Sequence, residues 1–218
     1  YNYFGLGGKM EKLKLRQFFV LFFAVLICCI IFGFFLKSIE LTNSVDYKIM
    51  TLVQSNNIFN KNYILLNFIK FITSLGDGKT YFILFVPFGV YFYYNNLKKE
   101  FLLLIATLLL TYMLNELIKH IVLRKRPIEF FIINMSGFSY PSGHAMNFSA
   151  FYLTFRFLLH EKFKSRIIDI TIYIMIFLIA ISRVILGVHW PTDVIVGLVL
   201  GYFCYNLAKL IYLNFWRD

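Results

Sequence analysis

The sequence predicts an all-α integral membrane protein: a bundle of six transmembrane helices, with interfacial amphipathic helices between the first two. Two observations favour this fold class. The 218 residues are 60% hydrophobic and 20% aromatic, and the mean hydropathy is +0.71, far above an ordinary soluble domain. The apolar residues also gather into runs close to the ~20 residues that a helix needs to cross a hydrocarbon core.

The predicted spans have an uncertainty of a few residues at each end. They are roughly 18–36, 80–95, 100–123, 142–159, 167–187 and 191–213. The second is the weakest, because it is short and contains Pro87 and Gly89. We see no linker or internal repeat, so residues 1–218 are expected to form a single domain.

The first span could be mistaken for a signal peptide, because basic residues precede it. It is long, however, and Lys37-Ser38-Ile39-Glu40 is a poor small-residue cleavage site, so we interpret it as a span. Met10 and the basic stretch after it resemble a natural start. Residues 1–9 are therefore expected to be an added remnant.

The segment 41–75 differs from the spans, because polar residues interrupt its apolar ones. This pattern favours amphipathic helices that lie on the bilayer surface. An extramembrane helical hairpin explains the same pattern equally well.

The net charge of +11 is compatible with nucleic acid, anionic lipid or a phosphorylated substrate as partner. Nucleic acid is disfavoured, because the basic residues flank apolar spans instead of lining a soluble helix or sheet. The three cysteines, Cys28, Cys29 and Cys204, lie inside apolar runs. They are expected to be packed thiols, not a disulfide framework.

An even number of spans places both termini on one side of the membrane. The positive-inside rule makes that side the cytoplasm, because short segments there hold Lys12, Lys14, Arg16, Lys98, Lys99, Lys162, Lys164, Arg166, Lys209 and Arg217. The composition, rich in Lys, Asn, Ile and Phe, suggests an AT-rich bacterial genome, so we expect the membrane to be a bacterial plasma membrane. Three polar clusters between positions 119 and 193 then converge at the outer boundary.

Lys119 and Arg126 form the first cluster. They are seven positions apart, nearly one face of a helix, and Pro127 disfavours helical geometry at Arg126, so the helix is expected to end there. Both cations could reach one anion. Snorkelling to the interface is an equally weighted alternative.

The neighbouring charges receive plainer interpretations. We expect Arg124 and Lys125 to be interfacial or lipid-attracting charges. Glu116 lies three positions before Lys119 and is expected to form an ion pair with Lys119 or His120 on the helix surface.

Pro141-Ser142-Gly143-His144 forms the second cluster, directly before an apolar helix. Ser142 is a natural N-cap, and the free N–H groups after it favour an anion. Gly143 would allow close backbone approach to a ligand, and His144 could hydrogen-bond or protonate it. A plain capped helix start is the alternative for this tetrapeptide alone.

The third cluster comprises Ser182-Arg183, His189 and Asp193. Ionisable residues at membrane depth are costly and indicate function. Arg183 offers a fork suited to phosphate, and Asp193, four residues after His189, could hold one ring nitrogen and leave the other free to attack. A buried structural His–Asp pair remains an alternative.

Zinc is the other alternative, with His144, His189 and Asp193 as ligands. The surrounding cations would repel a metal ion, so an oxyanion of high charge, such as phosphate, explains the three clusters better.

These residues, at these spacings and in this order, resemble the three-part signature of the type 2 phosphatidic acid phosphatase family. The parts are Lys119, six residues, Arg126-Pro127; Pro141-Ser142-Gly143-His144; and Ser182-Arg183, five residues, His189, three residues, Asp193. The superfamily also holds vanadium-dependent haloperoxidases and glucose-6-phosphatases. The predicted spans exclude the soluble haloperoxidase branch.

The resemblance implies a membrane phosphatase without a metal or other cofactor and with a catalytic core at about 100–213. It implies that His189 attacks phosphorus to form a phosphohistidine, that Asp193 orients His189, and that His144 protonates the leaving oxygen. The phosphoryl oxygens would be held by Lys119, Arg126, Ser142, the Gly143 N–H and Arg183.

A site at the outer boundary favours a lipid phosphate substrate: phosphatidylglycerol phosphate, phosphatidic acid or undecaprenyl diphosphate. An anion or lipid-phosphate binding or transport protein without hydrolysis is the alternative. It predicts binding without phosphate release and leaves the spacing of His189 and Asp193 unexplained.

Overall fold

The computed structural model describes residues 7–39, 44–55, 62–159 and 164–215, and within these residues the secondary structure is entirely helical. The elements are α1 (Gly7–Ser38), α2 (Val45–Ser55), α4 (Tyr63–Ser74), α5 (Gly78–Tyr94), α6 (Lys98–Val122), the 3₁₀ helix η2 (Ile128–Phe130), α7 (Gly143–Leu159), α8 (Arg166–Ile185) and α9 (Pro191–Phe215). The prediction of an all-α fold is confirmed.

Some predictions fall outside the described residues. They concern residues 1–6 of the expected remnant, the positions 41–43 and 56–61 of the interfacial segment, and the cytoplasmic charges Lys162 and Arg217. The described parts of the interfacial segment form α2 and α4.

The six predicted spans correspond to α1 and α5 to α9. Four of these helices are long and apolar enough to cross a membrane: α1 over Leu15–Ser38, α6, α8 and α9. The helices α5 and α7 have 17 residues each, or about 26 Å at 1.5 Å per residue, slightly less than a hydrocarbon core of ~30 Å. The chain is an integral membrane protein, as predicted.

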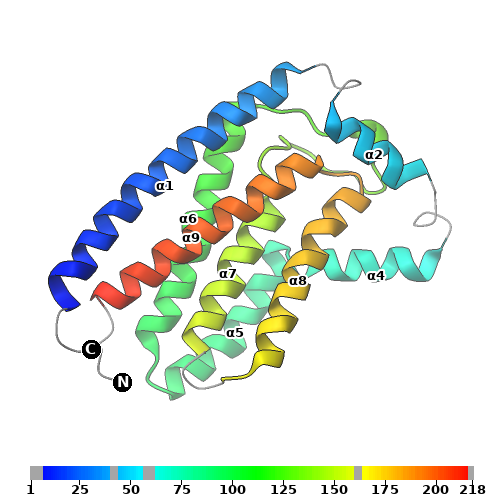
Figure 1. Ribbon diagram of the computed structural model, residues 1–218. Helices are drawn as coiled ribbons and strands as arrows, with labels where there is room; N and C mark the ends of the chain where they lie inside the picture. The colour runs from blue at the N-terminus through cyan, green and yellow to red at the C-terminus, as the bar shows by residue number, and fades with distance from the viewer. Residues whose placement is uncertain (1–6, 40–43, 56–61, 160–163, 216–218) are drawn as a thin grey trace.

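The helix α7 lies at the centre of the bundle, in contact with α6, α8 and α9, while α1 packs on α9 and α6 (Figure 1). The chain enters α1 and leaves α9 at the same end of the bundle (Figure 1). At the opposite end α6 and α8 finish and α7 and α9 begin (Figure 1). The three polar clusters lie on these four helix ends or in the loops between them.

Close packing of α7 on α9 depends on two glycines one turn apart. A Cβ atom on Gly197 would lie 2.6 Å from the Ser142 carbonyl oxygen, and one on Gly201 would lie 2.5 Å from the Met146 carbonyl oxygen. Small residues at this spacing allow helix backbones to approach closely in membranes. Asp193 lies one turn before Gly197, so this packing brings Asp193 beside the start of α7.

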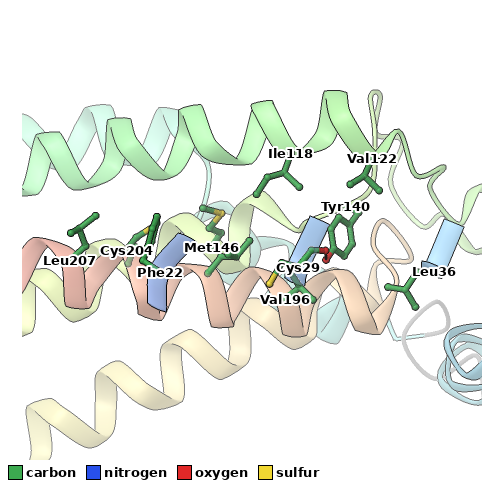
Figure 2. Close-up of a cluster of buried hydrophobic side chains, with 12 residues drawn as sticks. Phe22, Cys29, Leu36, Ile118, Val122, Tyr140, Met146, Val196, Cys204 and Leu207 are labelled. Carbon is green, nitrogen blue, oxygen red and sulfur yellow. Dashed lines mark hydrogen bonds between the residues drawn. The ribbon is translucent and has the colours of Figure 1, made fainter. Parts of the chain in front are cut away.

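A buried apolar cluster joins α1, α6, α7 and α9 on the other side of this contact (Figure 2). Ile118, Met146 and Cys204 are fully buried in it. Tyr140 also lies there, and its hydroxyl donates to the Cys29 carbonyl oxygen at 2.5 Å (Figure 2). The three cysteines are free thiols; Cys29 and Cys204 are buried, as predicted, whereas Cys28 is exposed and the prediction of a packed thiol is wrong there.

Candidate active site

Arg126 turns back into the protein after α6. The helix ends at Val122, and Leu123 takes a left-handed conformation with φ of 59°. Arg126 then donates through Nη1 to the Val188 carbonyl oxygen at 2.7 Å and through Nε to the Gly137 carbonyl oxygen at 3.1 Å. The helix therefore ends a few residues before Arg126, and the guanidinium is held by backbone from two loops.

His189 lies in the turn between α8 and α9. Gly187 makes this turn possible, because its φ of +73° favours glycine and because a Cβ there would collide with the Phe130 carbonyl group. The His189 residue is 2% exposed, and its Nε2 is 3.2 Å from Arg126 Nη1. Arg126 can only donate, so Nε2 is an acceptor and the proton of the neutral ring is on Nδ1.

The surroundings of His189 favour this neutral form. Burial, followed by the charges of Arg126 and Arg183, holds the pKa of His189 well below its ordinary value. At neutral pH Nε2 therefore stays unprotonated and keeps the electron pair that a nucleophile requires.

Asp193 faces the opposite side of the His189 ring. Its Oδ2 lies 3.7 Å from His189 Nδ1, a distance too long for a direct hydrogen bond. The carboxylate is fully buried and accepts hydrogen bonds from Arg124 Nη1 at 2.6 Å, from the Trp190 N–H at 3.0 Å and from Ser139 Oγ. Its orientation is thus set by groups other than His189.

The sequence-based interpretation of Arg124 is wrong. We expected an interfacial charge, but Arg124 is 2% exposed and forms ion pairs with Asp193 at 2.6 Å and Asp46 at 2.7 Å. A local pattern cannot identify partners that are 69 and 78 positions away.

Arg183 and Ser142 supply buried donors. Arg183 is 1% exposed and donates through Nη1 to Thr73 Oγ1 at 2.6 Å, whereas its Nε and Nη2 have no hydrogen-bond partner among the described residues. Ser142 Oγ likewise has no partner within the described part of the chain. The prediction that Ser142 is an N-cap is therefore wrong: Ser142 directly precedes α7, but its hydroxyl accepts no hydrogen bond from the N–H groups of that helix.

Gly143 lies against α6. A Cβ atom on Gly143 would lie 3.0 Å from Asn115 Oδ1 and 3.8 Å from Lys119 Nζ, so a larger residue would crowd this wall of the site. Lys119 forms an ion pair with Glu116, with Nζ and Oε1 2.9 Å apart, as predicted.

Sequence reasoning missed Asp77, which lies between α4 and α5. Its Oδ1 is 2.8 Å from His144 Nε2. This hydrogen bond is the main reason that the pKa of Asp77 lies below its usual value. A single carboxylate between Gly76 and Gly78, at a break between two apolar stretches, is the signal that could have identified it.

A cavity of about 410 Å³ connects these groups. Its polar end is lined by Lys119, Arg126, Gly143, His144 and His189. Leu108, Leu109 and Tyr112 of α6 line it further along, facing Tyr81 of α5. Ser142, Arg183 and Asp193 are buried and are not among the lining residues. Sites of this kind combine a few convergent polar groups with a mainly apolar wall.

The described residues contain no group of three or more His, Cys, Asp and Glu side chains that could hold a metal ion. His144, His189 and Asp193 thus lack the arrangement that the zinc alternative requires. Cations and N–H donors surround the two histidines instead, and such groups suit an anion.

The family model of the PAP2 superfamily matches residues 100–217, more than half of the chain. The chain therefore belongs to the PAP2 superfamily. This membership confirms the resemblance inferred from the three-part signature and, with the named relatives, the expectation of a membrane lipid phosphatase of this type.

The relatives include phosphatidylglycerophosphatase B of Bacillus subtilis, 33% identical over 143 residues that cover 63% of this chain and 70% of the relative. The undecaprenyl-diphosphatase of Sulfolobus acidocaldarius is 32% identical over 114 residues, 50% of this chain and 53% of the relative, so the match spans about half of that protein. The crystal structure of a transmembrane PAP2-type phosphatidylglycerolphosphate phosphatase from Bacillus subtilis has the same fold. It aligns with a TM-score of 0.70 and 24% identity over 90% of this chain and 94% of that one.

Proposed function

We propose that this protein hydrolyses a phosphate monoester or diphosphate of a membrane lipid through a phosphohistidine intermediate on His189. One observation supports the proposal above all others. Three buried donors have no acceptor among the described residues: Arg183 Nε, Arg183 Nη2 and Ser142 Oγ. They occur together with the neutral His189, whose Nε2 lies beside Arg126. Buried donors require acceptors, and the oxygens of a phosphoryl group would provide them.

In the first step His189 Nε2 attacks phosphorus. The bond between Nε2 and phosphorus forms as the bond from phosphorus to the lipid oxygen breaks, and His144 gives its proton to that oxygen. Lys119, Arg126, Arg183, Ser142 and the Gly143 N–H hold the phosphoryl oxygens, where preorganised donors stabilise the charge of the transition state. Asp193 stabilises the positive charge that develops on the imidazole ring.

In the second step water attacks the phosphohistidine. His144, now neutral, takes a proton from the water, the bond between Nε2 and phosphorus breaks, and inorganic phosphate leaves. A second cavity, next to the loop 125–138, shares the lining residues Arg126 and Met135 with the first. Atoms and charges balance over the two steps.

The lipid chains would lie along the apolar part of the main cavity, between α5 and α6. The candidate substrates are phosphatidylglycerol phosphate, phosphatidic acid and undecaprenyl diphosphate. The names of the two relatives favour the first and the last of these lipids.

The proposed membrane placement has six spans, α1 and α5 to α9, with cytoplasmic termini and the site at the outer face of a bacterial plasma membrane. The helices α2 and α4 would lie at that face as interfacial helices. Their exposed apolar side chains support this placement, among them Val45, Leu52, Tyr63, Ile64 and Phe68. Membrane-impermeant labelling of single cysteines near Lys125 and Lys164 tests it: only the residue near Lys125 should react from outside intact cells.

A released-phosphate assay on detergent-solubilised protein with a panel of lipid phosphates tests the activity. Turnover that is lost in His189→Ala supports the phosphatase. Tight lipid-phosphate binding without release would favour the binding or transport alternative.

A further inference from the structure

Three buried charges form a chain that leads away from the active site. Arg124 donates through Nη1 to Asp193 Oδ1 at 2.6 Å and through Nη2 to Asp46 Oδ2 at 2.7 Å. All three residues are at most 2% exposed. The guanidinium therefore bridges a carboxylate of α9 and a carboxylate of α2.

Thr192 forms further hydrogen bonds with both Asp46 and Arg124. Its backbone N–H donates to Asp46 Oδ1 at 2.9 Å, its hydroxyl donates to Asp46 Oδ2 at 2.5 Å, and that hydroxyl accepts from Arg124 at 2.9 Å. Asp46 thus has a hydrogen bond on each oxygen. These hydrogen bonds favour one geometry for Asp46, Thr192 and Arg124, although Arg124 Nε has no partner among the described residues.

The chain of charges does not touch the substrate cavity. None of Asp46, Arg124, Thr192 and Asp193 is among its lining residues. Arg124 therefore differs from Arg126, two positions later, which lines the cavity and lies 3.2 Å from His189 Nε2. The hydrogen bond from Arg124 to Asp193 is the contact through which Asp46 and Arg124 can act on His189.

The charges of Asp46, Arg124 and Asp193 suit an effect on His189 during the reaction. A pair of Arg124 and Asp193 alone would be neutral, whereas Asp46, Arg124 and Asp193 together carry one negative charge. His189 gains positive charge as it attacks phosphorus, and Asp193 Oδ2 is the carboxylate oxygen facing Nδ1 at 3.7 Å. A net negative charge at this place favours the transition state over the neutral ground state.

We propose that Asp46 and Arg124 are positioning residues for the nucleophile. Arg124 fixes the carboxylate of Asp193, and Asp46 offsets the charge of Arg124 so that Asp193 keeps its electrostatic effect on His189. The helix α2, far from the signature motifs in sequence, is in this way a part of the catalytic apparatus. The inference rests on the proposed role of His189 as nucleophile.

The test uses Asp46→Asn in the full-length protein in detergent, with a water-soluble aryl phosphate and a lipid phosphate as substrates. Asparagine removes the charge and keeps one acceptor oxygen, which can serve Arg124 Nη2 and the Thr192 hydroxyl, while its NH2 group replaces the oxygen that accepts from the Thr192 N–H. Partners that orient a metal-bound histidine contribute ~10–100-fold, and we expect a fall of about 10-fold in kcat with KM within about twofold. The fall should appear with both substrates, because the nucleophile serves both.

Arg124→Gln and the double variant Asp46→Asn/Arg124→Gln test the path of the effect. Since Asp46 acts through Arg124, the double variant should be no slower than Arg124→Gln alone. If the losses in kcat of the two single variants multiply in the double variant, Asp46 acts independently of Arg124, and the inference is wrong.

Met50→Ala is the matched control in α2. Met50 is fully buried in the contact of α2 with Trp190, Val194 and their neighbours, so its truncation loosens the packing without changing a charge. If Met50→Ala lowers kcat as much as Asp46→Asn, then Asp46 acts only by holding α2, and the proposal is wrong.

Thr192→Val is a milder second probe in case Asp46→Asn does not fold. It removes the hydrogen bonds that the hydroxyl donates to Asp46 and accepts from Arg124, and it keeps the backbone hydrogen bond to Asp46. It should lower kcat about threefold at constant KM. If Thr192→Val and Asp46→Asn both keep the full activity of the wild type, this inference is wrong, but the proposed function is unaffected. An inactive wild type on every lipid phosphate would instead count against the proposed function.

Discussion

The ring of His144 is held by Asp77, with Nε2 and Oδ1 2.8 Å apart. His144 lies in the first turn of α7 and lines the substrate cavity, and Asp77 lies directly before α5, between the lining residues Gly76 and Gly78. A nearby carboxylate favours the imidazolium form of a histidine. The proton donor of the proposed reaction is thus oriented by a carboxylate outside the three signature motifs.

Asp77→Asn should weaken the acid without harming the nucleophile. General acid catalysis contributes ~10²–10⁴-fold, and we expect a loss of about 10-fold in kcat with a lipid phosphate, whose leaving alkoxide needs a proton. With an aryl phosphate the loss should be within about twofold. Lys79→Gln, which removes a charge two residues away, is the matched control and should change neither rate. Equal losses of Asp77→Asn on both substrates would contradict the role.

The position of Asp77 illustrates what the sequence could and could not predict. The helices α5 to α9 begin and end within about three residues of their predicted bounds, because each is a long apolar run between polar or proline-containing breaks. The first span also agrees: α1 begins at Gly7, because a helix can continue into polar residues beyond its apolar run, but its apolar part Leu15–Ser38 lies within about three residues of the predicted 18–36.

Some residues of the site could likewise be predicted from the sequence, and others could not. Lys119, Arg126, His144 and His189 line one cavity, as their spacings suggested, because each is tied to a helix end by local sequence. Asp46, Arg124 and Asp77 were missed or misinterpreted, because their partners are 67 to 146 positions away. Only packing of α2, α5, α7 and α9 brings these pairs together, and one sequence contains no local signal for it.

A second prediction concerns the protonation of His189. Burial and the charges of Arg126 and Arg183 lower its pKa, so the ring should stay neutral as the pH falls through the ordinary histidine value of ~6.5. NMR of ¹⁵N-labelled histidine, with His189→Ala to assign the signal, should show no titration between pH 8 and ~6. Arg126→Gln removes a nearby cation and should raise the pKa. Titration near 6.5 in the wild type would refute the depressed value.

The third prediction concerns Arg183 and vanadate, which adopts the trigonal-bipyramidal geometry of phosphoryl transfer. Vanadate should inhibit competitively, because a site complementary to the transition state binds its mimics tightly. Hydrogen bonds to charged groups contribute ~1.5–3 kcal/mol, so Arg183→Ala should weaken inhibition roughly 10- to 100-fold. Lys125→Ala removes an exposed cation and is the control. Unchanged inhibition in Arg183→Ala would remove Arg183 from the phosphate site.

The last prediction separates the two histidines. His189→Ala removes the nucleophile, so no substrate, however reactive, should form a covalent phosphoenzyme. His144→Ala removes only the proton donor, whose contribution shrinks as the leaving group becomes a better anion. The His144 variant should therefore recover phosphoenzyme formation with an aryl phosphate or a diphosphate but not with a lipid monoester.

Rapid-quench trapping of acid-labile ³²P-labelled protein, with paired good and poor leaving groups, measures this difference. The wild type should label with every substrate that it hydrolyses. Equal loss in both variants on all substrates would mean that the acid and the nucleophile are wrongly assigned. Labelling that persists in His189→Ala would place the nucleophile on another residue, and the buried position of His189 beside Arg126 and Asp193 would then be structural.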